Sequence, residues 1–232
     1  MFRKVLIANR GEIAVRIIRA CRELGIPTVA IYSQADANSL HVRLATEAYC
    51  IGPAKSADSY LSIPAIMSAA MVSGADAIHP GYGFMSERAD FAEICEQQGI
   101  KFIGPSSDAM RKMGDKATAR RTMIENDVPV TPGTGIVHSV EEVQEFGNKV
   151  GYPIILKATA GGGGKGMRVC RNDEEVQLNM ELCQAEAKNF FGNPDVYAEK
   201  FLENPRHIEV QILGDSFGNV VHLGERDCSI QR

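Results

Sequence analysis

The residues best suited to chemistry lie in the stretch LKATAGGGGKGMRVC, which runs from Leu156 to Cys170 and holds four consecutive glycines. The segments on either side of the glycines are typical of β-strands. Ordering four glycines costs about 2–4 kcal/mol of backbone entropy relative to alanine. That cost favours a role for this loop beyond a simple structural turn.

Three interpretations of the glycine loop compete. A Walker A phosphate loop requires GxxxxGK followed by Ser or Thr and then a helix, whereas here Lys165 is followed by Gly166 and a strand-like segment. A flexible surface tip without a role stays open, because glycine clusters occur in surface loops. We favour a mobile flap whose bare backbone N–H groups close on polyphosphate, with Lys157 adding a positive charge beside the phosphates.

A second glycine stands where a dinucleotide fingerprint could begin. The stretch ANRGEIA follows a predicted strand and opens a predicted helix, but it lacks the first two glycines of GxGxxG. We therefore interpret Gly11 as part of a tight turn between strand and helix, and we disfavour a nicotinamide cofactor.

Composition limits the class of protein. The 232 residues are 44% hydrophobic and 23% charged, which is typical of one or two globular domains. The net charge of −4 and the scattered basic residues disfavour a nucleic-acid partner or a membrane partner. The six cysteines have no metal-ligand spacing, so we expect reduced, buried thiols. The N-terminus does not resemble a signal peptide, and we expect a cytoplasmic protein.

The first hundred residues alternate strand and helix, which predicts βαβ units and a parallel sheet. In the first helix, Ile13, Ile17, Cys21 and Leu24 lie on one apolar face that ends at Gly25. The predicted strands are 4–8, 28–32, 47–51, 76–79 and 101–104, and the helices begin at residue 12 and after residues 62 and 86.

The rest of the chain has a different pattern. A charged helical segment, 106–126, precedes VPVTPGTG (128–135), which we interpret as a linker because it holds two prolines and two glycines. A capping box, Ser139 and Glu142, opens the next helix. Further strands are predicted at 152–159, 167–170, 195–202, 206–213 and 219–232, with a helix from Asn172 and, in strand 206–213, Ile208, Val210 and Ile212 on one face.

Five motifs carry a resemblance to a known family. They are IANRGEIAVRIIRACRELGI, HPGYGFMSE, KATAGGGGKGMR, EKFLENPRHIEVQ and GERDCSIQR. Together they resemble biotin carboxylase, within the ATP-grasp superfamily, over residues 1–232. The resemblance implies an α/β fold: a Rossmann-like parallel-sheet N-terminal domain (1–105), a helical linker (106–130), a small α+β ATP-grasp lid domain with the glycine loop (131–201), and the beginning of an incomplete C-terminal ATP-grasp domain (202–232).

The resemblance also implies a reaction. ATP and bicarbonate would react through carboxyphosphate, and the carboxyl group would pass to biotin on a biotin carboxyl carrier protein. Mg²⁺ or Mn²⁺ would accompany the nucleotide. The parent enzyme would be a homodimeric biotin carboxylase component of an acetyl-CoA carboxylase, in fatty acid biosynthesis, or of a related carboxylase, and carboxyltransferase subunits would be its partners.

Site residues follow from the motifs residue by residue. The biotin pocket would include Tyr82 and Gly83, although a simple packed aromatic is an open alternative for Tyr82. Arg19 and Glu23 would lie at the dimer interface. For Glu209, an exposed sheet face and a place in the site are equally open. The positions that resemble ATP-binding residues are Lys116, Lys157, Gly161, Gly162, Gly163, Gly164, Gly166, Met167, Glu199, Lys200, Leu202, His207 and Gln231.

The resemblance places the family's metal-binding glutamates, and the residues that handle bicarbonate and biotin, beyond Arg232. We therefore assign no catalytic residue and no metal ligand within the chain, and we expect activity only in the full-length protein. Departures within the motifs are small: Ala160 and Lys165 stand where some relatives have Gly and Arg. Two other hypotheses stay open, namely a non-catalytic nucleotide-binding or dimerising fragment and another ATP-grasp ligase such as a carbamoyl-phosphate synthetase relative.

Overall fold

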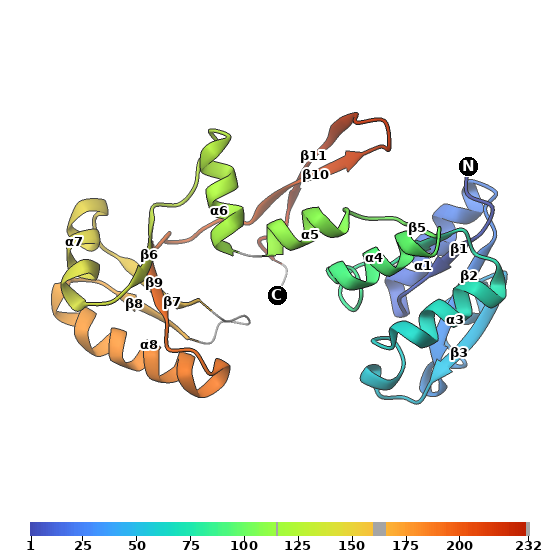
Figure 1. Cartoon of the computed structure of the whole chain (residues 1–232), viewed down its shortest axis with the longest axis horizontal. Helices are drawn as coiled ribbons and strands as arrows, with labels where there is room; N and C mark the ends of the chain where they lie inside the picture. Colours follow the sequence, from blue (N-terminus) through green and yellow to red (C-terminus); the bar gives the residue numbers. More distant parts are fainter. Residues whose placement is uncertain (115, 160–165, 231–232) are drawn as a thin grey trace. The chain divides into compact units, whose positions relative to one another are not determined.

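The chain forms two compact units, Met1–Val128 and Pro129–Arg232, which are described separately (Figure 1). This computed structural model describes residues 1–114, 116–159 and 166–230. In those ranges, no helix has the length and apolar character needed to cross a membrane.

The first unit is built on a parallel sheet, because strands and helices alternate along its sequence. The strand order is β3-β2-β1-β4-β5, and each neighbouring pair is parallel. The predicted Rossmann-like parallel sheet is therefore confirmed. The strands are β1 (Val5–Ile7), β2 (Thr28–Ser33), β3 (Glu47–Gly52), β4 (Ala77–His79) and β5 (Lys101–Phe102).

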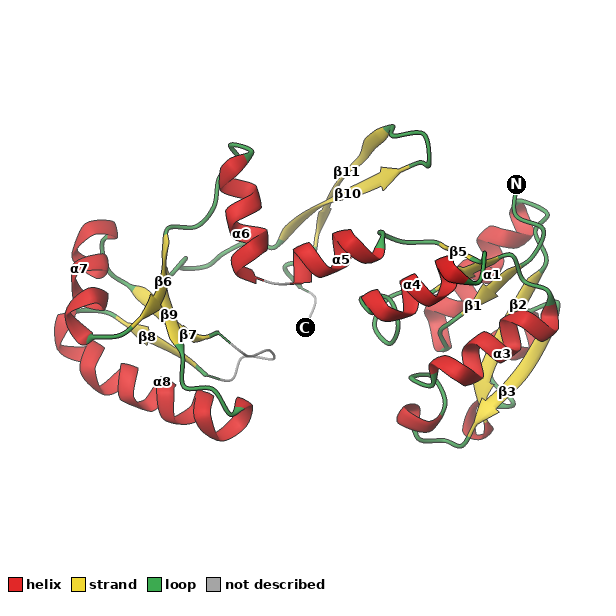
Figure 2. Cartoon of the chain, viewed as in Figure 1, coloured by secondary structure: helices red, strands yellow, loops and turns green. Residues whose placement is uncertain are grey.

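Helices cover both faces of this sheet (Figure 2). Leu6 packs in a buried cluster with Phe91 of α4, whereas the next residue, Ile7, packs with Ile18 of α1 on the opposite face. The α-helices of this unit are α1 (Gly11–Glu23), α2 (Leu40–Leu44), α3 (Ile63–Ser73), α4 (Ala89–Gln97), α5 (Ser107–Gly114) and α6 (Lys116–Glu125), with short 3₁₀ turns at η1 (Gln34–Asp36) and η2 (Ser56–Asp58).

The apolar face of α1 differs from the prediction at its end. Ile17 and Cys21 are buried as expected, but Leu24 is 64% exposed. The helix ends at Glu23, so Leu24 occupies the cap position and no longer points toward the sheet. Ile26, just beyond the turn, is buried in the core instead.

The strand order places two loops side by side at the carboxyl edge of the first sheet. The chain moves outward from β1 to β2 and β3, then returns to place β4 on the other side of β1. Such a reversal opens a crevice at the carboxyl ends of the two central strands. The Ala8 N–H, directly after β1, donates to the carbonyl of His79, the last residue of β4, at 2.9 Å.

The second unit contains a four-stranded antiparallel sheet in the order β6-β9-β7-β8. Its helices α7 (Val140–Val150) and α8 (Val176–Phe191), with the short η3 (Asp173–Glu175), pack against one face. Alternation along β7 explains this, since Ile154 and Leu156 point into the core beneath the helices. The strands are β6 (Gly133–Val137), β7 (Ile154–Ala158), β8 (Met167–Cys170) and β9 (Val196–Lys200).

Strand β6 corrects the predicted linker. Gly133, Thr134 and Gly135 lie in a strand, although their composition is typical of a turn. The Thr134 hydroxyl accepts a hydrogen bond from the Ala198 N–H at 3.0 Å, and the strand pairs with β9 with one register shift. Pairing with a distant strand therefore overrides the local preference.

The predicted capping signals are present. Ser139 accepts a hydrogen bond from the Glu142 N–H at 3.3 Å, and the Glu142 carboxylate accepts from the His138 N–H at 2.9 Å. Asn172 likewise accepts from the Glu175 N–H at 3.1 Å. These contacts satisfy N–H groups that the first helical turn leaves free.

The end of the chain forms a hairpin of β10 (Ile208–Gly214) and β11 (Val220–Asp227). Ile208, Val210 and Ile212 alternate with polar residues along β10, as predicted, and all three side chains are exposed. In β11 a bulge interrupts the alternation, because Gln211 stands opposite two residues of the partner strand and Gly224 adopts a φ of 89°.

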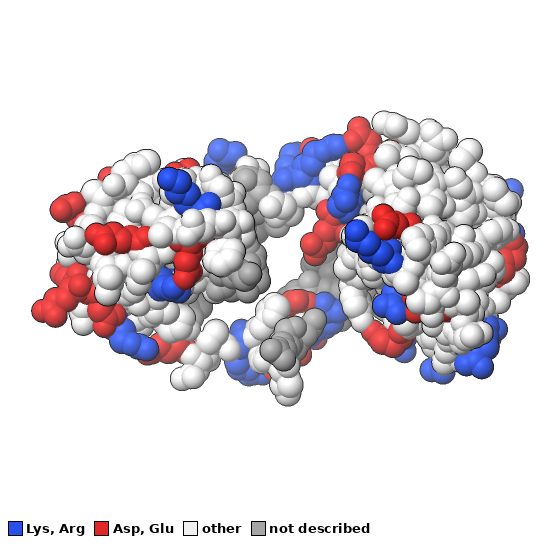
Figure 3. All heavy atoms as spheres, turned by 90° about the horizontal axis from the view of Figure 1, so that it is seen from below, with Lys and Arg blue, Asp and Glu red and all other residues white. Residues whose placement is uncertain are grey.

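Most of the six cysteines are buried. All six cysteines are free, and Cys21, Cys95, Cys170 and Cys183 are buried as predicted. The prediction is wrong for Cys50, which is exposed because its side of β3 faces solvent, and Cys228 in the terminal hairpin is only partly buried. On the face drawn in Figure 3, Lys and Arg side chains are interspersed with Asp and Glu.

Candidate functional site

Lys157 lies on the face of the second sheet that the helices leave open. Its neighbours Leu156 and Ala158 are buried, whereas its own side chain is 30% exposed. The ammonium Nζ lies 2.5 Å from Oε2 of Glu199, which extends from β9 on the same face. The predicted strand lysine therefore has a specific carboxylate partner rather than a purely solvated position.

Two backbone hydrogen bonds hold the base of the glycine loop. The Ala158 N–H donates to the Gly166 carbonyl at 2.9 Å, and the Thr159 N–H donates to the Asp195 carbonyl at 2.9 Å. The loop thus joins two antiparallel strands, β7 and β8, as predicted. A Walker A loop is excluded, because a strand rather than a helix follows the glycines.

Position 166 favours glycine for two reasons, its backbone conformation and the close approach of Ala158. Its φ is +66°, and an added Cβ would lie 2.9 Å from the Ala158 Cβ. Met167 follows directly, stands opposite Lys157 in the strand register and is 38% exposed. Gly161, Gly162, Gly163 and Gly164 lie outside the described residues.

The end of β9 has backbone groups left for other partners. The Lys200 N–H donates to the Pro132 carbonyl at 2.8 Å, and proline has no N–H with which to return a bond to the Lys200 carbonyl. Two residues further on, Leu202 is 52% exposed, and its N–H has no partner among the described residues. One acceptor and one donor therefore stand close together at this strand end.

The Lys200 side chain stabilises this strand end. Its ammonium group donates to the carbonyls of Gly151 at 2.8 Å and Tyr152 at 3.1 Å. These bonds connect the end of β9 to the turn between α7 and β7. Lys200 is therefore held by its side chain, and only its backbone carbonyl is left for a ligand.

The hairpin places His207 beside a charged pair. The His207 Nε2 lies 3.3 Å from Oε1 of Glu209, and Arg226 forms an ion pair with the same carboxylate. The hydrogen bond from Arg226 lowers the pKa of Glu209. Glu209 is thus engaged within its own hairpin, which leaves both sequence interpretations of this residue open. Gln231 and the side chain of Lys116, at the start of α6, lie outside the described part of the chain.

Tyr82 and Gly83 lie in the first unit, in the loop that follows β4. Tyr82 is 61% exposed, so the alternative of a simple packed aromatic is wrong. Its hydroxyl donates to the carboxylate of Glu12 in the first turn of α1. Gly83 has a φ of 67°, which a residue with a side chain rarely adopts.

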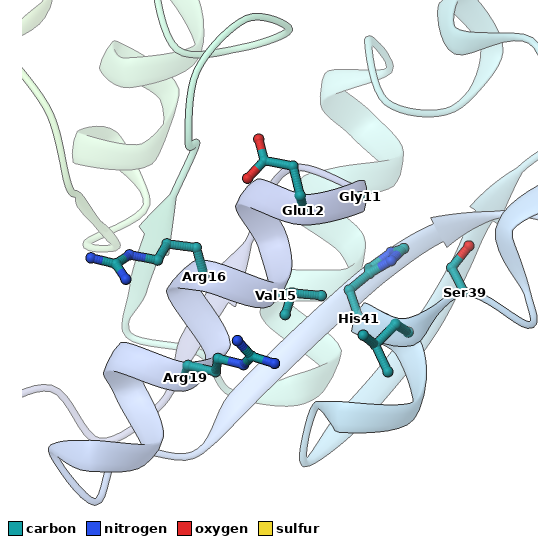
Figure 4. A pocket seen from close by; sticks show the side chains of 8 residues that line it. Gly11, Glu12, Val15, Arg16, Arg19, Ser39 and His41 are labelled. Atoms are coloured by element: carbon teal, nitrogen blue, oxygen red, sulfur yellow. The ribbon is translucent and has the colours of Figure 1, made fainter.

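Arg19 and Glu23 are both exposed on α1. Across the described residues, no ion pair joins them, in keeping with the weak pairing expected for that order of charges. Arg19 lines an open groove of about 530 Å³ between α1 and α2. Figure 4 shows Arg16 and Arg19 extending from α1 in different directions. The groove is lined by Gly11, Glu12, Val15, Arg16, Arg19, Ser39, Leu40 and His41.

Comparison with known proteins decides the family. Residues 1–110 match the family model described as "Biotin carboxylase, N-terminal domain", and residues 115–232 match "Carbamoyl-phosphate synthase L chain, ATP binding domain". The whole chain is 60% identical to biotin carboxylase 1 of Bacillus subtilis and 58% identical to a Nostoc biotin carboxylase, covering 52% of each. The chain belongs to the biotin carboxylase family. The chain spans about half the length of the curated relatives it matches.

Solved biotin carboxylase structures share the fold. A Campylobacter jejuni biotin carboxylase complex with a β,γ-ATP ligand has a TM-score of 0.87 at 50% identity, and all of this chain aligns with 52% of that one. The biotin carboxylase domain of a thermophilic 2-oxoglutarate carboxylase, bound to bicarbonate, has a TM-score of 0.89 at 52% identity, with 100% and 51% covered. The family assignment made from the five motifs is confirmed.

The contacts of Asp36 bear on whether the turn at Gly11 could bind a dinucleotide. Asp36, in the 3₁₀ turn η1 that follows β2, lies near the position at which a dinucleotide-binding fold often uses an acidic residue for ribose. Here its carboxylate accepts from Arg10 at 2.6 Å and from the Tyr60 hydroxyl at 2.8 Å. Burial by itself raises the pKa of Asp36, but the bonds from Arg10, Tyr60 and Ser33 lower it below its usual range. Asp36 is therefore committed to internal contacts, which favours the interpretation of Gly11 as a turn.

Sequence reasoning missed several polar residues of the first unit. Asn9, Asp36 and His41 are all buried; Asn9 lies within a motif that carried the resemblance but was assigned no role, and Asp36 and His41 belong to no motif or periodic pattern. His41 is 1% exposed, its Nε2 lies 3.3 Å from the Ile31 carbonyl, and burial lowers its pKa. The order of the strands, which brings these loops together, was the missing information.

A metal site is not evident in the described residues. No group of three or more His, Cys, Asp or Glu side chains lies close enough there to hold a metal ion. The described carboxylates near Lys157 and His207 are paired with basic side chains. With their charges already paired, they do not fit a divalent cation.

Proposed function

We propose that this chain binds ATP for the carboxylation of biotin on a carrier protein, with bicarbonate as the carboxyl source and carboxyphosphate as the intermediate. The full-length protein would be the biotin carboxylase component of an acetyl-CoA carboxylase or a related carboxylase. The observation that carries the proposal is Lys157 on the open face of the second sheet, beside the base of the glycine loop.

Lys157 and the glycine loop would hold the phosphates. In the structure Glu199 neutralises Lys157 at 2.5 Å, and a triphosphate with more negative charge would compete for the same ammonium group. The loop around Gly161–Gly164 would add backbone N–H donors. Lys116, His207 and Gln231 would be further nucleotide contacts.

The end of β9 would bind the base. Adenine presents a donor, its amino group, beside an acceptor, a ring nitrogen. The Lys200 carbonyl and the Leu202 N–H offer the complementary acceptor and donor. Glu199, on the same strand, would lie between the base and Lys157 and couple the two ends of the nucleotide.

Tyr82 and Gly83 would belong to the biotin pocket, and Arg19 and Glu23 to a homodimer interface. The carrier protein and carboxyltransferase subunits would be the macromolecular partners, and Mg²⁺ would accompany the nucleotide. A related 2-oxoglutarate carboxylase structure supports this proposal, since it is described as a domain dimer with MgADP, ADP and bicarbonate.

The test is the identity of the acceptor. In the full-length protein, labelled bicarbonate should be transferred to free biotin in the presence of ATP, and ammonia should not be accepted in its place. Carboxylation of ammonia without carboxylation of biotin would overturn the proposal.

That outcome would favour a carbamoyl-phosphate-forming ligase, the alternative suggested by the name of the second family model. Binding of ATP without turnover on either acceptor would favour a nucleotide-binding module.

A further inference from the structure

Asn9 ties together the two loops at the carboxyl edge of the first sheet. It lies in the short connection between β1 and α1 and is 3% exposed. Its side-chain NH₂ donates to the carbonyls of Pro80 and Tyr82, both at 2.7 Å, and its oxygen accepts from the Arg10 N–H at 2.8 Å. Only this orientation of the amide allows all three bonds, since the NH₂ group alone can donate to two carbonyls.

Gly81 packs directly on Asn9. A Cβ added at Gly81 would lie 2.9 Å from the Asn9 Nδ2 and 3.1 Å from the Ile13 Cγ1, and its φ is +65°. The Gly81 N–H also donates to the Nδ1 of His79 at 3.0 Å. The backbone of residues 80–82 is therefore shaped against the Asn9 side chain.

The Tyr82 side chain, in contrast, is held by few contacts. The residue is 61% exposed, and its hydroxyl donates to Glu12. The direction of the ring is therefore set by the hydrogen bond to Glu12 and by the backbone that Asn9 holds. We propose that Asn9 is a positioning residue for the biotin acceptor: it fixes the carbonyls of Pro80 and Tyr82 and so directs Tyr82 and Gly83 toward the acceptor. This inference rests on the proposed function.

The first test replaces Asn9 by Asp in the full-length protein. The substitution keeps the shape and the acceptor for Arg10, but it sets an oxygen against two carbonyl oxygens at 2.7 Å. We expect the KM for free biotin to rise about tenfold, while the KM for ATP stays within about twofold. Asn179→Asp is the matched control, because the Asn179 amide also donates to a carbonyl, that of Val169 at 3.1 Å, in the second unit.

A second pair of variants tests the contact between Asn9 and Gly81 by changing Gly81. Gly81→Ala introduces a Cβ against Asn9, whereas Gly99→Ala introduces one at nearly the same φ, +69°, with nothing within 4 Å. Both carry similar backbone strain, so a rise in the KM for biotin only in Gly81→Ala isolates the contact with Asn9. This pair carries the test if Asn9→Asp does not fold.

Amide hydrogen exchange gives a readout that does not depend on biotin. The Gly81 amide, which donates to the His79 Nδ1 at 3.0 Å, should exchange at least about tenfold faster in Asn9→Asp and Gly81→Ala than in the two controls. Unchanged exchange there, or equal increases in the KM values for biotin and ATP, would overturn the positioning role. Absence of biotin carboxylation by the wild-type protein, with the exchange result as expected, would instead refute the proposed function and leave the loop contact established.

Discussion

The two sheets of this protein place their polar and charged side chains in different ways. The parallel sheet of the first unit is covered on both faces, so its polar residues lie in the loops beyond the strand ends, as Asn9 and Tyr82 do. The antiparallel sheet of the second unit is covered by helices on one face, and Lys157 projects from the middle of the open face. A fully covered sheet can use only its edges, whereas a half-covered sheet can place a charged side chain on a strand itself.

The largest effect expected concerns the open face. Lys157→Gln removes the positive charge and keeps much of the side chain's volume. We expect kcat/KM for ATP in the full-length protein to fall about 100-fold, because removal of one electrostatic contact to a reacting group typically costs 10²–10³. Lys149→Gln, at an exposed position on α7, is the control and should change the value less than about twofold. Equal values for the two variants would contradict the role of Lys157.

A second prediction tests the difference in covering directly, through the free energy of unfolding. Leu6→Ala and Ile7→Ala remove neighbouring side chains on opposite faces of the first sheet, and both positions are fully buried. Each should cost about 2–5 kcal/mol. In the second sheet Leu156→Ala should cost as much, but Met167→Ala on the open face should cost less than about 1 kcal/mol. Denaturant unfolding followed by circular dichroism measures all four, and a large loss for Met167→Ala would show that the open face is packed.

A third prediction concerns the base of the glycine loop. Gly166→Ala should destabilise the second unit by about 1–2 kcal/mol from its left-handed φ alone. The approach to the Ala158 Cβ at 2.9 Å should add to this cost. Gly192→Ala, with a φ of +74° and nothing within 4 Å, provides the comparison. Thermal unfolding should show the greater loss for Gly166→Ala, and equal losses would mean that the close contact relaxes freely.

The smallest effect expected is a pH dependence at the edge of the first sheet. The pKa of Asp36 in the folded protein lies below its usual value, since the bonds from Arg10, Tyr60 and Ser33 outweigh burial. The ionised carboxylate therefore stabilises the fold fully above the unfolded pKa of about 3.9, and this contribution is lost as pH falls through the folded pKa.

The difference in unfolding free energy between wild type and Asp36→Asn should accordingly be constant from pH 6 to about pH 5 and shrink below about pH 4. Denaturant unfolding at several pH values measures it. A difference that grows as pH falls would mean that the folded pKa is raised instead.

The sequence predicted most elements because their periods are strong. Alternating strand and helix indicated the parallel sheet, and the glycines between two strands indicated a hairpin, both of which the structure shows. Strand β6 was missed because Gly133, Thr134 and Gly135 have no strand preference of their own. Their extended conformation comes from pairing with β9, more than sixty residues later, and no local pattern records that pairing.

The site shows the same division. Lys157 could be predicted as a residue with a specific role, because a charge within an apolar strand needs a partner. That the partner is Glu199 depends on the register of β7 against β9. The exposure of Tyr82 and the burial of Asn9 depend likewise on the return of β4 to the side of β1, which the order of segments along the chain does not specify.

By itself, the amino-acid sequence determined most of the segments that form strands and helices, where the glycine-rich part of the loop lies, and the family to which the chain belongs. These properties are local, since they depend on residue type and on spacing within one segment. Tertiary structure alone decided which charge meets which, and which loops share an edge. Strand pairing joins residues 42 and 73 positions apart at hydrogen-bond distance, as in Lys157 with Glu199 and Asn9 with Tyr82, and only the folded chain brings such groups together.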